Sequence, residues 1–304
     1  MRNELEAILA ADFSELGDVE KLAGVLYDRC YTRSILDSVR SHRPRGHPER
    51  GTHECARDIE AANQSRAAWD EGWIVDQVLD DGRVLARKGG AARAFLPGEF
   101  LTHRGLGSGP EAGARISVFL APGSSDLQSG FYFAFGETVG DVSETENLVR
   151  FYWNVSMEGA PRLMEALTRE FNRFQVPFRF KCASQASDYP RRDAAVLYLN
   201  RRYYAIAALL VERVHSLVRP WLGESTPLFA RRLADGLGFA EDPGDSFGKH
   251  RMKILAAAMA SSTGGELQDR VKEVRVHFER QGLSLDQPWL NAGSVDVYEF
   301  PCRA

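Results

Sequence analysis

The sequence has few cysteines, no long hydrophobic run and no large excess of charge of either sign. Its four cysteines stand far apart without a C-x-x-C pair, which argues against zinc and disulfide frameworks and favours a reducing compartment. Apolar stretches such as Ile206–Val211 are far shorter than the ~20 residues of a membrane span. The formal net charge of -4 gives no support to bulk binding of nucleic acid. We therefore expect no metal, no cofactor, no nucleic acid and no membrane partner.

The amino terminus also lacks the apolar segment of a secretory signal, so we expect a cytoplasmic protein. Hydrophobic periodicity predicts an α+β fold with a mixed or antiparallel sheet and flanking helices. We expect three regions: a helical region over 1–70, a small β-rich module over 71–140, and an α+β core over 141–304.

Individual elements follow from the same patterns. Helical spacing runs through much of 1–40, and further helices are expected at about 159–173, 204–218 and 247–259. A hairpin with Asp81-Gly82 at its turn opens the β-rich module, and strands are expected at 115–120, 131–136, 148–155, from 177 and at 295–298. Proline and glycine clusters predict loops at 41–51 and 236–244.

Cations gather in one part of this nearly balanced chain. Between Arg179 and Arg202 there are six Lys/Arg and two Asp. Such a concentration favours an anion-binding site, and a solvated arginine-rich loop is the alternative.

Strand alternation then predicts which of these side chains share a face. Arg150, Tyr152 and Asn154 fall on one side of their strand, and Arg179 and Lys181 fall on one side of theirs. If both strands belong to one sheet, its polar side offers arginine forks and a compact ammonium group to a phosphate. A sheet with one solvated face is the alternative.

A helix start at Ser246 provides a second possible anion site. Its unpaired N–H groups and positive dipole end favour a phosphate, and Gly248 permits close approach. His250 and Arg251 follow within the first turns, and a histidine moves protons readily at neutral pH. A capped helix with an incidental histidine is the alternative.

Three blocks of sequence carry a resemblance to a known family. They are Asn172-x-Phe-x-x-Pro-Phe-x-Phe-Lys181, Tyr189-x-Arg-x-Asp-x-x-Val-Leu-Tyr198, and Leu233-Ala-x-Gly-Leu-Gly-x-Ala-Glu-Asp-Pro-Gly-x-Ser-Phe-Gly-x-His-Arg251. In order and spacing they resemble the type III effector family of the Hop outer-protein A kind, which has stand-alone bacterial relatives in peptide natural-product pathways. Gly72-Trp73 and Gly130-Phe131-Tyr132 also fit, and the resemblance is weakest before residue 70.

The resemblance implies a phosphoserine/phosphothreonine lyase, which is a carbon–oxygen lyase. Relatives in class V lanthipeptide and thioamitide pathways act on a ribosomal precursor peptide after a kinase-like partner has phosphorylated it, leaving dehydroalanine or dehydrobutyrine. The alternatives are a non-catalytic phosphopeptide- or leader-binding scaffold for the kinase, and an effector that acts on a host phosphoprotein.

β-Elimination requires a base, cations for the leaving phosphate and often an acid. We expect Lys181 to be the base, because neighbouring cations would lower its pKa. His250 is the expected acid, with Tyr189 as an alternate donor, and Asp193 is expected to orient Arg191. The expected phosphate-binding residues are Arg150, Arg179, Arg191, Ser246, Gly248 and Arg251.

Overall fold

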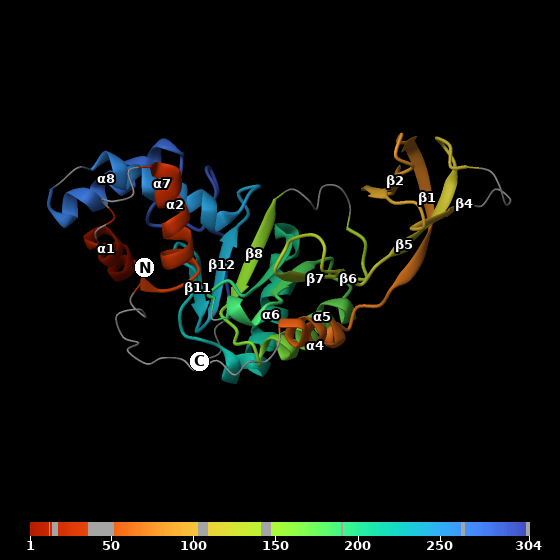
Figure 1. The fold of residues 1–304 in the computed structure, drawn as a ribbon, viewed down its shortest axis with the longest axis horizontal. Helices are drawn as coiled ribbons and strands as arrows, with labels where there is room; N and C mark the ends of the chain where they lie inside the picture. The colour runs from red at the N-terminus through yellow and green to blue at the C-terminus, as the bar shows by residue number, and fades with distance from the viewer. Residues whose placement is uncertain are drawn as a thin grey trace.

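Two antiparallel sheets organise the chain (Figure 1). The computed structural model describes residues 1–11, 13, 18–35, 52–102, 109–140, 147–189, 191–262 and 265–301, with side chains of 52–54 left out. The smaller sheet has the strand order β3-β2-β1-β5-β4 and the larger has the order β11-β12-β8-β10-β9-β7-β6. With helices on both sides of the larger sheet, this is the expected α+β fold.

The strands have the following bounds: β1 Ala68–Val78, β2 Val84–Lys88, β3 Ala91–Phe95, β4 Phe100–Thr102, β5 Arg115–Leu120, β6 Gly123–Ser124, β7 Phe131–Phe135, β8 Leu148–Trp153, β9 Arg179–Ala183, β10 Ala195–Asn200, β11 Arg231–Ala234 and β12 Leu237–Glu241. The helices are α1 Arg2–Ala10, α2 Val19–Leu26, the π-helix η1 Tyr27–Tyr31, α4 Thr52–Ala62, α5 Ala160–Arg173, α6 Tyr204–Val218, α7 Phe247–Ser261 and α8 Leu267–Arg280. Short 3₁₀ turns lie at Ala186–Asp188, Arg201–Tyr203 and Arg219–Trp221.

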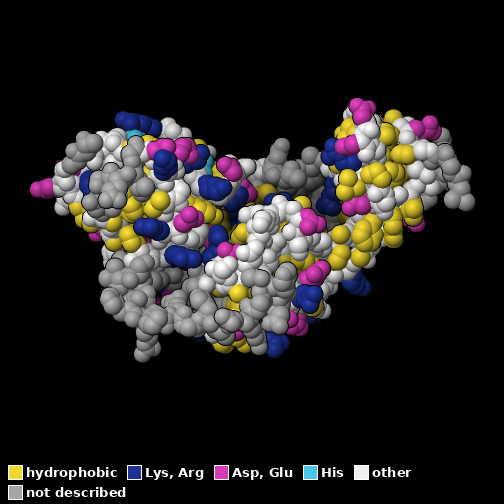
Figure 2. All heavy atoms as spheres, in the orientation of Figure 1, with side chains coloured by type: hydrophobic (Ala, Val, Ile, Leu, Met, Phe, Trp, Pro, Cys, Tyr) yellow, Lys and Arg dark blue, Asp and Glu magenta, His cyan; other side chains and the backbone are white. Residues whose placement is uncertain are grey.

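The small sheet forms around the predicted hairpin. Gly82 takes the positive φ of 82° that the turn needs, and the Asp81 carboxylate accepts from the backbone N–H of Arg83. Trp73 is fully buried in the core of this sheet, which extends away from the rest of the molecule in Figure 1. Figure 2 shows hydrophobic side chains gathered over this module. Trp69 of β1 and Leu101 of β4 are large apolar side chains that are exposed.

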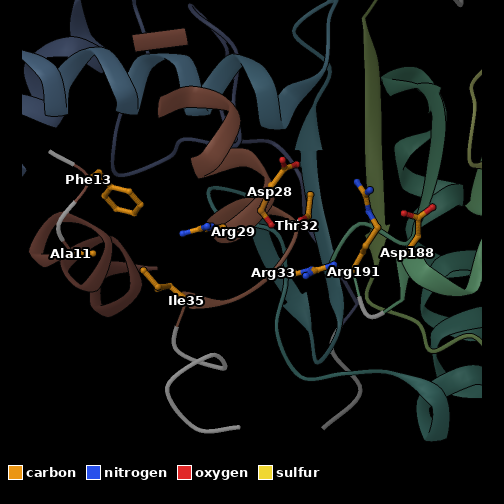
Figure 3. Close-up of a pocket in the computed structure, with 9 residues that line it drawn as sticks. All are labelled: Ala11, Phe13, Asp28, Arg29, Thr32, Arg33, Ile35, Asp188 and Arg191. Atoms are coloured by element: carbon orange, nitrogen blue, oxygen red, sulfur yellow. Dashed lines mark hydrogen bonds between the residues drawn. The ribbon is translucent and has the colours of Figure 1, made fainter. Parts of the chain in front are cut away.

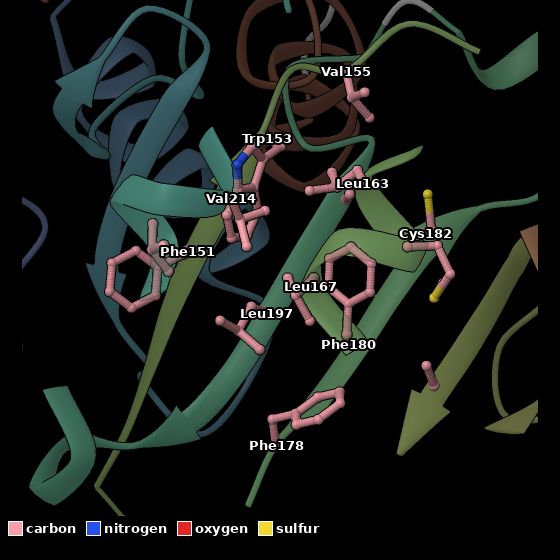
Figure 4. Close-up of a cluster of buried hydrophobic side chains, with 14 of the residues drawn as sticks. Phe151, Trp153, Val155, Leu163, Leu167, Phe178, Phe180, Cys182, Leu197 and Val214 are labelled. Atoms are coloured by element: carbon pink, nitrogen blue, oxygen red, sulfur yellow. The ribbon is translucent and has the colours of Figure 1, made fainter. Parts of the chain in front are cut away.

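Helices α4, α5 and α6 lie against one face of the large sheet. Phe151 and Trp153 of β8 pack there with Phe180 of β9, opposite Leu163 and Leu167 of α5 (Figure 4). These side chains are fully buried, and aromatic rings of this size dominate the apolar area of a core. The burial of these alternate residues leaves their sequence neighbours on the opposite face.

That opposite face is covered by α2, η1, α7 and α8. Tyr152, Val196 and Tyr198 of the sheet pack there with Tyr31 of η1 and Phe247 of α7. The predicted alternation of the β8 side chains between the two faces is therefore confirmed. However, aromatic rings and helices cover much of the face that was expected to be polar.

The predicted helices α5, α6 and α7 are confirmed, as is Ser246 as the N-cap, whose Oγ accepts from the Lys249 N–H. In the N-terminal region the expected helical run divides into α1, α2 and η1. The expected loop at 41–51 lies outside the described residues.

Two predictions of local structure are wrong. The loop expected at 236–244 contains the buried interior strand β12, in which Gly238 lies close to the side chains of Thr226 and Ala230. Gly236 belongs to the turn before this strand, where its φ is 66°. The segment 295–298, expected to be a strand, has no regular secondary structure and pairs with no strand of either sheet. Side chains hold it, since Arg231 bonds Asp296 and the Tyr298 hydroxyl donates to Glu241.

Candidate functional site

Three cations from neighbouring strands surround the ring of Tyr198. Antiparallel register places Tyr198 of β10 between Arg150 of β8 and Arg179 of β9. The Cζ atoms of these arginines lie 5.0 and 4.9 Å from the ring centroid, and Lys181 Nζ lies 5.9 Å from it. The sheet therefore joins Arg150, Arg179 and Lys181 on one face, as the strand alternation predicted.

Lys181 is the ionisable group with the most unusual environment in this cluster. Its Nζ lies 4.5 Å from the centroid of the Phe131 ring and donates to Gln128 Oε1 at 3.3 Å. Burial, together with repulsion from the neighbouring arginines, lowers the pKa of Lys181 to about 8, against the opposing attraction of Asp193. A useful fraction of this amine is therefore neutral near physiological pH, as a base requires.

Arg191 reaches the same cluster from the loop before β10. Its Nε and Nη2 donate to the two carboxylate oxygens of Asp193 at 2.9 and 3.2 Å, and its Cζ lies 5.5 Å from the Phe131 ring centroid. This two-point contact fixes the plane of the guanidinium group. The geometry is the one expected if Asp193 orients Arg191.

Tyr27 of the π-helix η1 also faces this arginine. Arg191 Nη2 donates to the Tyr27 hydroxyl at 3.4 Å, and burial, reinforced by Asp193, raises the pKa of Tyr27 to about 12. The hydroxyl therefore stays protonated at neutral pH and can donate a hydrogen bond to an anion.

Arg150 connects the cluster to the start of α7. It is buried, donates to both carboxylate oxygens of Asp242 at 2.9 and 2.7 Å, and donates from Nη2 to the carbonyl of Asp245 at 2.7 Å. These bonds hold Arg150 rigidly, and the carboxylate of Asp242 balances its charge.

The cluster as a whole keeps an excess of positive charge. Asp193 and Asp242 pair with Arg191 and Arg150. Within the part of the chain that the structure describes, no carboxylate forms an ion pair with Arg179 or Lys181. Arg179 is exposed and Lys181 is partly exposed, so an anion from solution can reach both.

The start of α7 supports packing more than a phosphate cradle. Gly248 is buried against the ring of Tyr31, and a Cβ at this position would overlap that ring. Arg251, expected to bind phosphate, is fully buried: its Nε and Nη2 donate to the carbonyls of Pro288 and Leu290, each at 2.9 Å. The structure therefore does not bring Arg251 to the cation cluster, and phosphate contacts of Ser246 and Gly248 stay predictions.

The two expected acids lie in different surroundings. Tyr189 is buried in the core on the other face of the large sheet from the cation cluster, and its hydroxyl donates to the Ala183 carbonyl at 2.6 Å. His250 is half-buried, and burial and the adjacent Arg251 lower its pKa. Because an arginine can only donate, the contact of 2.7 Å between Arg251 Nη1 and His250 Nδ1 leaves the ring proton of the neutral histidine on Nε2.

Sequence reasoning missed four partners of the cluster: Tyr27, Gln128, Tyr198 and Asp242. Tyr198 ends the second sequence block, and its strand alternation could have shown that it shares a face with Val196. The other three come from helices and loops whose docking no local pattern reveals.

Comparison with protein families gives one match. The model of the HopA1 effector protein family matches residues 123–290, which is more than half of the chain. The chain belongs to the HopA1 effector protein family. The matched range contains every strand of the large sheet and all four cations of the cluster, and it begins after the small sheet.

Two solved structures from the same class of proteins have a similar fold. The effector protein from Pseudomonas syringae pv. tomato strain DC3000 is 17% identical, with a TM-score of 0.53 over 95% of each chain. The effector protein from Pseudomonas syringae pv. syringae strain 61 is 16% identical, with a TM-score of 0.54 over 96% of this chain and 97% of that one. No curated protein matches. Identities this low establish only that this HopA1 family member shares their fold.

Among the residues that the structure describes, no helix has the length and apolarity to cross a membrane. No group of three or more His, Cys, Asp or Glu in the same residues is placed to hold a metal ion.

Proposed function

We propose that this chain is a lyase that eliminates phosphate from phosphoserine or phosphothreonine in a peptide. The observation that carries the proposal is a lysine with a pKa of about 8 inside a cluster of arginines. A base and a phosphate site in one place are what β-elimination needs.

In the proposed step, neutral Lys181 takes the proton from Cα of the phosphorylated residue. The electron pair of that C–H bond forms the Cα=Cβ double bond. The bond between Cβ and the bridging oxygen breaks, and phosphate leaves with its electron pair. The products are a dehydroamino acid, inorganic phosphate and a protonated lysine, which returns its proton to water.

Arg179 and Arg191 would hold the phosphate oxygens. Arg191 has a guanidinium plane fixed by Asp193, so it loses little side-chain freedom when it binds an oxyanion. Arg150 is already engaged with Asp242 and acts through its charge and by fixing the start of α7. The arginines also raise the fraction of Lys181 that is neutral before the substrate arrives.

The Tyr27 hydroxyl, which contacts Arg191 of the cluster, would donate a hydrogen bond to the leaving oxygen. The lowered pKa of His250 disfavours the imidazolium ion that full proton transfer would need. Because a phosphorylated side chain has a second pKa of about 6, it is mainly a dianion at neutral pH, so arginines and a hydrogen-bond donor must stabilise the charge on the leaving oxygens. His250 as the acid stays a prediction.

We propose a ribosomal precursor peptide as the substrate and a kinase-like protein of the same pathway as the partner that phosphorylates it. This part rests on the resemblance of the three sequence blocks to lyases of lanthipeptide-type pathways. No charge or contact of the cluster selects serine over threonine.

The direct test incubates the purified protein with a synthetic phosphoserine or phosphothreonine peptide. Elimination removes phosphoric acid, so the peptide should lose about 98 Da and release phosphate. Lys181→Met should abolish this loss. The control Lys272→Met, which changes an exposed lysine of α8, should not alter it. Undiminished elimination by the Lys181 variant would exclude it as the base.

A non-catalytic phosphopeptide-binding scaffold is the second candidate. The excess positive charge and the fixed guanidinium plane of Arg191 would serve binding without turnover. Retention of intact phosphopeptide by the wild-type protein, with no mass loss, would favour the scaffold. An effector acting on a host phosphoprotein would use the same site and would be recognised by its protein substrate.

A further inference from the structure

A cavity of about 790 Å³ opens beside the cation cluster (Figure 3). Its walls come from the N-terminal segment on one side and from the loop before β10 on the other. The lining residues are Ala11, Phe13, Asp28, Arg29, Thr32, Arg33, Ile35, Asp188 and Arg191. Arg191 belongs to both the cavity and the cluster, so the two sites share a wall. The volume lies in the range of pockets that bind ligands.

The N-terminal wall is firmly attached to the large sheet. Arg192, next to Arg191, is buried and donates from its backbone N–H to the Thr32 carbonyl at 2.8 Å. Its guanidinium group pairs with Glu4 of α1. These bonds tie α1 and the end of η1 to the loop that carries Arg191. The wall also contains the π-helix η1, an irregularity that occurs often at functional sites.

The cavity lining carries charges of both signs, and its two arginines on the N-terminal wall are exposed. Arg29, Arg33 and Arg191 line it against Asp28 and Asp188. Arg191 is paired with Asp193, whereas Arg29 and Arg33 are exposed and form no ion pair with any carboxylate of the described residues.

An apolar surface accompanies these charges. Phe13 and Ile35 line the same cavity, and Figure 3 shows the side chain of Arg29 extending toward their side of it. An aliphatic stem could pack against this surface while its charged end meets the arginines.

We propose that this cavity binds a second anionic side chain of the peptide whose phosphorylated residue lies at Arg191. The anion is a carboxylate of Asp or Glu or a second phosphorylated residue, and the two have the same recognition chemistry here. An extended chain advances about 3.3 Å per residue, so a residue a few positions from the reacting one can reach an adjoining cavity. The inference rests on the proposed function, since it assigns a neighbouring subsite to that substrate.

The test uses three series of synthetic phosphoserine peptides with an otherwise neutral sequence. In the first, glutamate is moved through the positions on either side of the phosphoserine. The second carries a second phosphoserine at the same positions, and the third carries glutamine. The dissociation constant is measured with the Lys181→Met variant, which leaves the substrate intact, and kcat/KM with proteins that retain Lys181.

We expect one position at which an anion strengthens binding by about three- to tenfold over glutamine, as two partly solvated ion pairs would provide. In Arg29→Ala/Arg33→Ala the ratio between the glutamate and glutamine peptides should fall to about one. Arg115→Ala, an exposed arginine of the small sheet, should keep the wild-type ratio. With an added peptide that carries lysine at that position, Arg33→Glu should reverse the preference in favour of lysine, which a loss of folding could not produce.

The outcomes separate the two proposals. Equal affinities and rates for all three series, with elimination intact, would overturn the subsite and leave the lyase standing. Selective binding of the anionic peptides without elimination by proteins that retain Lys181 would overturn the lyase and keep the subsite. A preference seen only in the doubly phosphorylated series identifies phosphate as the anion, and one seen with glutamate identifies a carboxylate.

Discussion

The pH dependence of elimination provides the sharpest prediction from this structure. The base must be deprotonated to accept a proton, so kcat/KM should rise with pH while the amine loses its proton and should level off above the pKa of Lys181. Because kcat/KM reports the ionisation of the free enzyme, the relevant pKa is that of the unliganded cluster, about 8. A bound phosphate dianion would raise this value, so kcat should respond at higher pH.

The magnitude follows from the ionisation equilibrium. With a pKa of about 8, about one lysine in eleven is neutral at pH 7, compared with about three in ten thousand at the ordinary value of 10.5. The environment of Lys181 therefore enriches the active form roughly 300-fold at neutral pH. Between pH 6 and 7 the rate should rise about ninefold, and between pH 8 and 9 by less than about twofold.

Initial rates of phosphate release across this range, at substrate concentrations well below KM, measure the profile. A titration of ¹³C-labelled lysine side chains by NMR, with Lys181→Met to assign the signal, measures the same pKa without turnover. A rate that keeps rising tenfold per unit beyond about pH 9.5, or a lysine signal that titrates near 10.5, would refute the argument that burial and arginines prepare this base.

Three further substitutions test the surroundings of the site. Asp193→Asn should lower kcat/KM by about ten- to a hundredfold, because Arg191 loses its orienting partner. It should also move the pH profile to lower pH, because the charge of Asp193 raises the pKa of Lys181. An unmoved profile would contradict this electrostatic coupling. Gly248→Ala should destabilise the fold by about 1–3 kcal/mol in urea unfolding, since its Cβ meets the ring of Tyr31, and unchanged stability would show that the ring moves aside. Arg251→Met should cost about 3–5 kcal/mol in the same assay, because it leaves two main-chain carbonyls and a histidine nitrogen without a donor; a fully stable variant with weakened phosphopeptide binding would instead return this arginine to the phosphate site.

Local patterns were sufficient for much of the core. The alternation of β8 separates Phe151 and Trp153 from Arg150 and Tyr152 whatever the fold, because successive side chains of a strand point to opposite faces. The start of α7 was equally local, since Ser246 caps a backbone N–H only three residues away. The joining of Arg179 and Lys181 to the face of Arg150 needed only the assumption of a common sheet.

The strand β12 shows where local pattern was misleading. Its segment contains glycines and acidic residues that resemble a turn, yet it pairs with β11 on one side and β8 on the other. Gly238 lies in this strand where the Cβ atoms of Thr226 and Ala230 come close, whereas Gly236 takes a φ of 66° in the turn before the strand. A glycine required by close packing and one required by a turn are identical in a single sequence.

The amino-acid sequence by itself determined the alternating faces, the main helices and the gathering of cations around Lys181, because these depend on residues close together in the chain. The tertiary structure decided which cations remain available. It buries Arg251 in the core and brings Tyr27 into contact with Arg191, which is 164 positions away in the sequence. Such contacts depend on how separate elements dock, and docking is set by the packing of the whole core, which no single segment contains.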